Sequence, residues 1–299
     1  MSKRNNSERR GVEEIENLET EKKEVQNYSS ECSVDDFFLP AAPVAVPLPT
    51  KGRFYPEGHP LKGKEFVEIR SITTKDEEIL ASDTYVKQGI SMDRMLDGLF
   101  IDRRVRTEDM FNVDKNSVLM RARIESYGST YSAKIICPEC GNASAQKIDL
   151  EQFHLKDTPE DVLFDSDGQF PIRFKWNGPK GEIDVEVRVR LLSGKDEKRL
   201  FQSNKKKEKH KMHKTPLQDL YKTLIVSVNG NDDPMFLEKF VSQMHTKMAN
   251  KIYMEYSRIV PNIDTTIEFY CDDGGCNAKS DINVPLGANF FRHDHSEIS

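Results

Sequence analysis

The chain has 299 residues, of which 36% are hydrophobic and 31% are charged, and its formal net charge is −6. This length accommodates one or two domains with a hydrophobic core, while the high charged fraction predicts that part of the chain lies outside any core. The negative net charge argues against a surface that is basic throughout. No apolar run is long enough to span a bilayer, and no apolar segment follows the basic start as a secretory signal requires.

The N-terminal 36 residues are polar and densely charged, which predicts a disordered arm. Prolines then recur at close spacing up to Pro49, which favours an extended linker because proline cannot occupy a helix interior. We therefore expect a disordered polar arm and Pro-rich linker at 1–47 and a globular domain at 48–299.

The first part of this domain reads as one strand followed by helices. Apolar and polar residues alternate over 66–72, as in a half-buried strand. Thr74 to Glu77 has the pattern of a capping box, Ser91 is placed to cap a short helix, and Asp114 is placed to cap a longer helix that ends near Gly128.

Two pairs of strands are predicted around two pairs of cysteines. The flanking strands cover 131–136, 145–150, 265–270 and 278–284. Between them lies an inserted region at about 151–262, with a β-branched strand at 182–192 and helices at Ser193 onwards, 216–228, 234–244 and 246–259. The predicted fold class is α+β.

The cysteines carry the most specific signal in the sequence. Cys137 and Cys140 have the spacing C-x2-C, Cys271 and Cys276 have the spacing C-x4-C, and each pair lies on a turn between two strands. Two such hairpins facing each other form a split zinc ribbon, in which four thiolates hold one structural Zn2+ in the tetrahedral geometry that zinc prefers. The fifth cysteine, Cys32, lies in the polar arm and is expected to be a spare.

Other interpretations of the cysteines remain open at this point. They are ordinary free cysteines or two strained disulfides if the hairpins do not meet. A redox C-x-x-C motif should open a helix, whereas Cys140 is followed by Gly141 and a strand pattern. In a reducing cytosol, paired cysteines indicate a metal more often than a disulfide.

A lysine-rich run at 205–214 offers a different function, that of a nucleic-acid-binding zinc-ribbon protein. The run has no arginine or aromatic residue to read or stack bases, so we expect a solvated loop and no specific nucleic-acid binding. We find no sequence motif of a hydrolase, nucleotide-binding protein or metalloprotease, and no paired carboxylates that nominate a nuclease or a lysozyme-like hub enzyme. The sequence therefore predicts a protein that is not an enzyme.

Several short motifs follow one another along the chain, and their ordered set is more specific than any one of them. They are Pro-Leu-Pro-Thr-Lys-Gly-Arg-Phe-Tyr-Pro at 47–56, Ile-Arg-Ser-Ile-Thr-Thr-Lys-Asp-Glu at 69–77, Arg-Ile-Glu-Ser-Tyr-Gly at 123–128, Cys-Pro-Glu-Cys-Gly at 137–141, Arg-Leu-Leu-Ser-Gly-Lys-Asp-Glu at 190–197, Val-Asn-Gly at 228–230 and the closing cysteine pair with Phe290 and Phe291. This ordered set resembles the baseplate hub assembly proteins of T-even-type contractile-tailed bacteriophages. The chain departs from that pattern at its second cysteine pair, where we expect C-x2-C.

The resemblance implies a late phage protein of virion assembly that works through contacts with other baseplate hub proteins. It implies activity in the host cytoplasm during assembly, with the tail baseplate of the virion as a second location. Phe290 and Phe291 are expected to dock the C-terminal segment onto the core or onto a partner.

Overall fold

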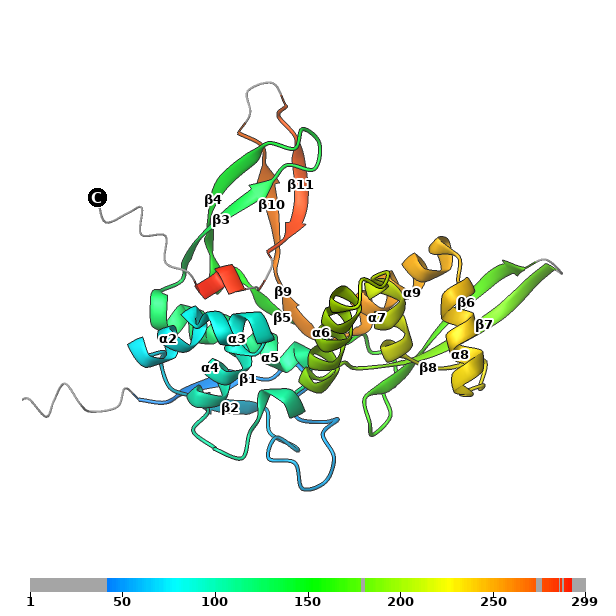
Figure 1. Ribbon diagram of the computed structural model, residues 1–299, viewed down its shortest axis with the longest axis horizontal. Coiled ribbons are helices and arrows are strands. Elements are labelled where there is room, and N and C mark those ends of the chain that lie inside the picture. Colours follow the sequence, from blue (N-terminus) through cyan, green and yellow to red (C-terminus); the bar gives the residue numbers. More distant parts are fainter. Residues whose placement is uncertain (1–41, 179–180, 273–275, 285, 287, 292–299) are drawn as a thin grey trace, which may run out of the picture. The chain divides into compact units, whose positions relative to one another are not determined.

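The computed structural model describes residues 42–178, 181–272, 276–284, 286 and 288–291 (Figure 1). The predicted polar arm at 1–36 and the spare Cys32 lie outside the described residues. The described part combines helices with small antiparallel sheets, which confirms the α+β class.

The first part of the fold is a two-stranded sheet with helices after it. Strand β1 (Val44–Pro47) pairs antiparallel with β2 (Phe66–Ile69). The elements that follow are α2 (Thr74–Ala81), α3 (Asp83–Gln88), α4 (Ser91–Leu99), the short 3-10 helix η2 (Thr107–Asp109) and α5 (Asn112–Tyr127). Val44–Pro47 lies in the segment expected to be a linker, and its one proline, Pro47, is tolerated because β1 is an edge strand with β2 as its only paired neighbour in the described sheet.

All three predicted N-terminal helix caps differ from the structure. Helix α4 has Ile90 at its cap position, and Ser91, the expected cap, is its first helical residue. Helix α2 is capped by Thr73, whose N–H and hydroxyl both donate to Asp76, so the cap lies one residue earlier than expected. Helix α5 begins at Asn112 with Phe111 at the cap position, and Asp114 is fully buried inside its first turn. Asp114 therefore does not cap α5. Its predicted end at Gly128 is confirmed.

The predicted cysteine hairpins are both present (Figure 1). Strand β3 (Thr130–Ile136) pairs with β4 (Ala143–Asp149), and β10 (Thr266–Tyr270) pairs with β11 (Lys279–Asn283). A short ladder that sequence reasoning missed joins β5 (His154–Lys156) to β9 (Asn262–Asp264). This ladder brings together the two ends of the inserted region.

The inserted region contains the order β6 (Gln169–Gly178), β7 (Gly181–Arg190), α6 (Gly194–Lys209), α7 (Pro216–Leu224), β8 (Ile225–Val228), α8 (Pro234–Gln243) and α9 (Thr246–Ile259). Strands β6, β7 and β8 form one antiparallel sheet. We predicted one helix over 216–228, but the β-branched run Ile-Val-Ser-Val pairs with β7 instead.

The lysine-rich run also differs from the expected loop. Helix α6 continues to Lys209, so the first half of the run is helical. Lys207 contacts Thr215 and Asp219, and Lys205 donates to the carbonyl of Lys87 at 2.6 Å. Lysine is a good helix former, which is consistent with the continuation of α6 into the run. The side-chain contacts tie two of its lysines to other parts of the chain.

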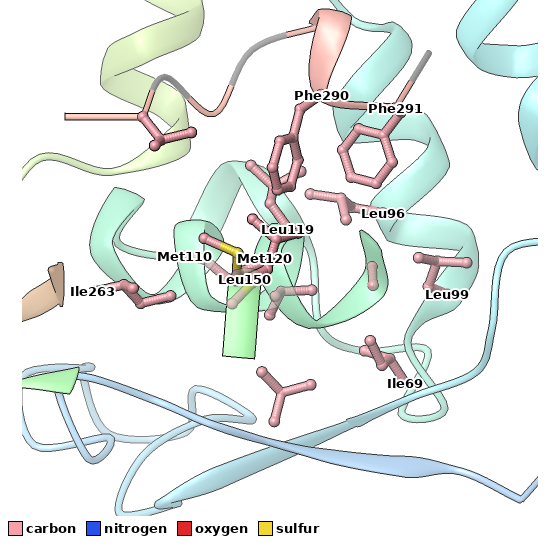
Figure 2. Close-up of a cluster of buried hydrophobic side chains, with 14 of the residues drawn as sticks. Ile69, Leu96, Leu99, Met110, Leu119, Met120, Leu150, Ile263, Phe290 and Phe291 are labelled. Atoms are coloured by element: carbon pink, nitrogen blue, oxygen red, sulfur yellow. The ribbon is translucent and has the colours of Figure 1, made fainter. Parts of the chain in front are cut away.

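The described residues contain two hydrophobic clusters. The first gathers β1, β2, α4, α5 and the cysteine hairpins, and the second gathers β6, β7, β8, α7, α8 and α9. Figure 2 shows Phe290 and Phe291 reaching into the first cluster near Leu96 and Leu119. Both rings are buried, which confirms the expected docking of this segment onto the core.

Candidate metal centre

The first cysteine pair lies at the tip of the β3–β4 hairpin. Cys137 follows directly after β3, and its N–H donates to the carbonyl of Asn142 at 2.9 Å, one step beyond the last strand pair. The N–H of Gly141 donates to the carbonyl of Cys137 at 3.0 Å, and Gly141 has a φ of 76°. Glycine adopts this left-handed conformation without strain, so the turn closes tightly and both thiols project from one tip.

The second pair lies at the equivalent place on the β10–β11 hairpin. Cys271 follows directly after β10, and its N–H donates to the carbonyl of Ala278 at 3.0 Å. The residue after Cys276 is Asn277, which has a φ of 50°. Asparagine is one of the few residues other than glycine that is often found in this region. In both hairpins, therefore, one cysteine follows the first strand directly and the second cysteine is followed by a left-handed residue.

The two tips meet, so all four sulfur atoms lie together. The Sγ atoms of Cys137 and Cys276 are 3.9 Å apart, and those of Cys140 and Cys271 are 3.6 Å apart. All four Sγ atoms lie within 4.8 Å of one another. Disulfide sulfurs would be about 2.05 Å apart, so no disulfide joins these pairs. A zinc–sulfur bond of about 2.3 Å implies sulfur separations of about 3.8 Å in a tetrahedral site, which the cross-hairpin pairs match.

Two polar contacts hold the hairpins together beside the sulfurs. Ser144 Oγ donates to the carboxylate of Asp272, and Gln146 Nε2 donates to the carbonyl of Tyr270 at 3.3 Å. Each contact joins strand β4 to a residue at the end of β10 or just after it. Sequence reasoning missed both, because a polar residue on an exposed strand gives no signal of its partner.

Backbone groups at the first tip favour the thiolate form. The N–H of Cys140 lowers the pKa of Cys137 to about 7, against the opposing effect of burial. The N–H of Ala278 also lowers the pKa of Cys276, but burial and the neighbouring sulfurs of Cys140 and Cys137 leave it raised overall. The thiolate is the form of cysteine that binds metal. The lowered pKa of the buried Cys137 therefore favours metal binding at this side of the site.

Residues 57–292 match the family model described as T4 bacteriophage base plate protein. The chain belongs to this family. The matched range of this chain includes both cysteine hairpins and the inserted region between them. This confirms the resemblance to a T4-type phage baseplate protein.

Searches of the curated proteins and of the solved structures gave no significant match. Family membership makes the chain a phage baseplate structural protein and associates it with the virion tail. Among the described residues, no helix has the length and apolar character needed to cross a membrane.

Proposed function

We propose that this base plate protein serves in assembly of the tail hub, through protein–protein contacts, on a fold stabilised by one structural zinc. The observation that carries the proposal is the convergence of four cysteines from two distant hairpins in a chain of the base plate family.

The donor set fits zinc by number, type and spacing. Cys137, Cys140, Cys271 and Cys276 supply four thiolates at separations suited to tetrahedral coordination. Zinc held in this way joins chain segments and contributes to folding, since four protein ligands leave no position for substrate or water. Beside the sulfurs, Asp272 of one hairpin accepts a hydrogen bond from Ser144 of the other, so the two tips are joined by more than the cysteines.

We infer that the protein acts by contact and without turnover. In the described part of the chain, the four cysteines form the one cluster of three or more His, Cys, Asp or Glu side chains suited to a metal. This donor set is a structural one, and the base plate family is named for a structural assembly.

Exposed apolar side chains on the inserted region are candidates for partner contact. Met235 on α8 and Met254 on α9 are 81% and 69% exposed, and Tyr253 and Leu217 are also largely exposed. Contiguous exposed apolar patches are typical of protein interfaces, so these side chains are the first to test for partner contact. We expect other baseplate hub proteins as partners, met in the host cytoplasm during assembly.

Genetic complementation in infected cells tests this proposal. We expect Cys137→Ser to lose the metal, lower the melting temperature and block hub assembly together. Met254→Glu, a surface variant, should keep both the metal and the melting temperature but impair assembly. The contact model fails if α8 and α9 surface variants all assemble normally while replacement of a single acidic residue, in a stably folded chain, abolishes assembly.

The alternative function is that of a nucleic-acid-binding zinc-ribbon protein using the lysine-rich run. Lys205 and Lys207 are engaged by their own chain, which leaves fewer lysines to contact phosphates. We expect only weak association that disappears at physiological salt, since phosphate contacts made by lysine release counterions. Sub-micromolar affinity for DNA or RNA at physiological salt, measured by fluorescence anisotropy, would favour the alternative.

A further inference from the structure

A strand-to-helix turn occurs twice in the molecule with the same bonds. At the end of β2, Arg70 donates to both carboxylate oxygens of Asp76 at 2.6 and 3.0 Å. At the end of β7, Arg190 donates to both carboxylate oxygens of Asp196 at 2.8 and 2.7 Å. The side chains of the first pair are 30% and 4% exposed, and those of the second pair are 30% and 5% exposed.

The residues between arginine and aspartate repeat the same arrangement. Thr73 donates to Asp76 through its N–H at 2.9 Å and its hydroxyl at 2.7 Å. Ser193 donates to Asp196 through its N–H at 3.0 Å and its hydroxyl at 2.9 Å. Helices α2 and α6 start at the next residue in each case. The sequences Arg-Ser-Ile-Thr-Thr-Lys-Asp-Glu and Arg-Leu-Leu-Ser-Gly-Lys-Asp-Glu thus encode one structure twice.

The strands around the two turns also correspond. Ile69, just before Arg70, pairs with Val44 of β1 on one side and with Phe100 on the other. Val189, just before Arg190, pairs with Phe170 of β6 and with Ile225 of β8. Both third-strand residues follow directly after a helix, α4 in the first case and α7 in the second.

The correspondence continues to the cysteines. Helix α5 packs on β1, and helix α9 packs on β6. After each of these helices the chain enters a cysteine hairpin, and the residue after the second cysteine, Gly141 or Asn277, has a left-handed conformation in both. The second pair has two more residues between its cysteines.

We propose that the chain is an internal duplication of one module, with residues 44–149 as the first module and 169–283 as the second. Each module consists of two paired strands, the Arg–Asp turn, a helical crossover to a third strand position, a long helix and a cysteine hairpin. Each module contributes two of the four cysteines. The next step rests on the zinc role proposed above: the metal centre joins the two modules to each other.

Exchange of the turn sequences tests the duplication without involving the metal. The first graft replaces residues 70–77 by the sequence of 190–197, through Ser71→Leu, Ile72→Leu, Thr73→Ser and Thr74→Gly. Because the bonding side chains are kept, we expect a melting temperature lower by only about 2–4 °C, the effect of one added glycine in a helix. A matched control carries the same graft with Asp76→Leu and should fall much further.

The reverse graft has the opposite expectation. It introduces Gly194→Thr, and a Cβ at this position would lie 2.3 Å from the carbonyl oxygen of Thr107. It also introduces Leu191→Ser in the second core, where Leu191 is buried. The reverse graft should therefore be strongly destabilised. The duplication is refuted if the first graft is destabilised as much as its Asp76→Leu control.

Hydrogen exchange on the full chain, with and without a zinc chelator, tests the joint. We expect chelation to increase exchange at the hairpin tips near Cys137 and Cys271 and to leave β6, β7 and β8 protected. Loss of protection throughout β6, β7 and β8 would contradict the inference that the metal centre acts as a joint between two modules. A chain that holds no zinc before chelation would instead contradict the proposed function, and the graft result would stand independently.

Discussion

The two modules share the same order of strands, turn and helices, but a different segment contacts the start of the long helix in each. In the first module, the connection from β1 to β2 is a long loop that lies over the start of α5 and is anchored there by Asp114. In the second, β6 and β7 form a hairpin joined between Gly178 and Gly181, and Trp176 near its end contacts His245 at the start of α9. The difference shows that the Arg–Asp turn and the strand pairing define the module, while the connection between its first two strands is free to change.

Loss of the hydrogen bonds that anchor the first loop to Asp114 should have the largest effect on stability. Asp114 accepts hydrogen bonds from the N–H of Thr50 at 3.0 Å, the hydroxyl of Thr50 at 2.6 Å and the hydroxyl of Tyr55 at 2.8 Å. Asp114→Ala leaves these buried donors unpaired, so we expect a loss of about 3–5 kcal/mol in the free energy of unfolding.

Urea unfolding measures this loss, with Tyr55→Phe as the control. Removing one hydroxyl while keeping the ring should cost about 1–2 kcal/mol. Among the described residues of the second module there is no equivalent of Asp114, so hydrogen exchange should increase around α5 and not in β7. Equal loosening of both regions would show that the anchor supports the whole fold and not the first module alone.

A second asymmetry concerns the residue after each cap. Gly194 approaches the backbone of Glu108 so closely that a Cβ would lie 2.8 Å from its Cα, whereas Thr74 occupies the same place in the first turn and is exposed. We expect Gly194→Ala to cost about 1–3 kcal/mol through overpacking, and Thr74→Ala to be nearly neutral. Thermal unfolding of the two variants provides the comparison, and similar melting temperatures would contradict it.

The two Arg–Asp pairs should respond alike. Lysine cannot reproduce the two parallel bonds that arginine makes to a carboxylate. Arg70→Lys and Arg190→Lys are therefore each expected to cost about 1–3 kcal/mol in the free energy of unfolding. If one substitution is neutral and the other severe, the two turns are not energetically equivalent.

Acid should weaken both turns. Burial alone would raise the pKa of Asp196, but the bonds from Arg190 and Ser193 bring it down to about 2, and the pKa of Asp76 is likewise lowered by Arg70 and Thr73 against burial. An unfolded aspartate has a pKa of about 3.9, so the stabilisation is present above that pH and is lost as the pH falls toward 2.

Urea titrations at several pH values check this effect, which is the smallest of those expected. Asp196→Asn should be less stable than the wild-type chain at neutral pH and should lose less stability between about pH 4 and pH 2. A variant that loses as much as the wild-type chain would show that other carboxyls cause the acid dependence.

Sequence reasoning located most elements because their patterns are local. Helix α9 has the predicted ends, and both cysteine hairpins were found from alternation beside a turn. The failures involve tertiary context. Strand β8 continues an apolar helical pattern, and its pairing with β7 decided its conformation. The three-residue strands β5 and β9 are too short to show a period.

The candidate site was predictable in composition but not in its surroundings. The four cysteines could be grouped because their spacing on turns is specific, and the structure brings their sulfurs together. Asp114 was misread as a helix cap because an aspartate before an apolar run fits a cap equally well. Its partners Thr50 and Tyr55 are distant in the sequence, so only the fold reveals its burial.

Metal analysis of the full-length protein tests the central claim most directly. Mass spectrometry of the purified chain under non-denaturing conditions should give one zinc per chain and four cysteines at 137, 140, 271 and 276 protected from alkylation. Cys137→Ser and Cys276→Ser, one from each hairpin, should each abolish zinc binding. A chain with no metal and four freely alkylated thiols, or with either variant still holding a full equivalent of zinc, would contradict a site shared by the two hairpins.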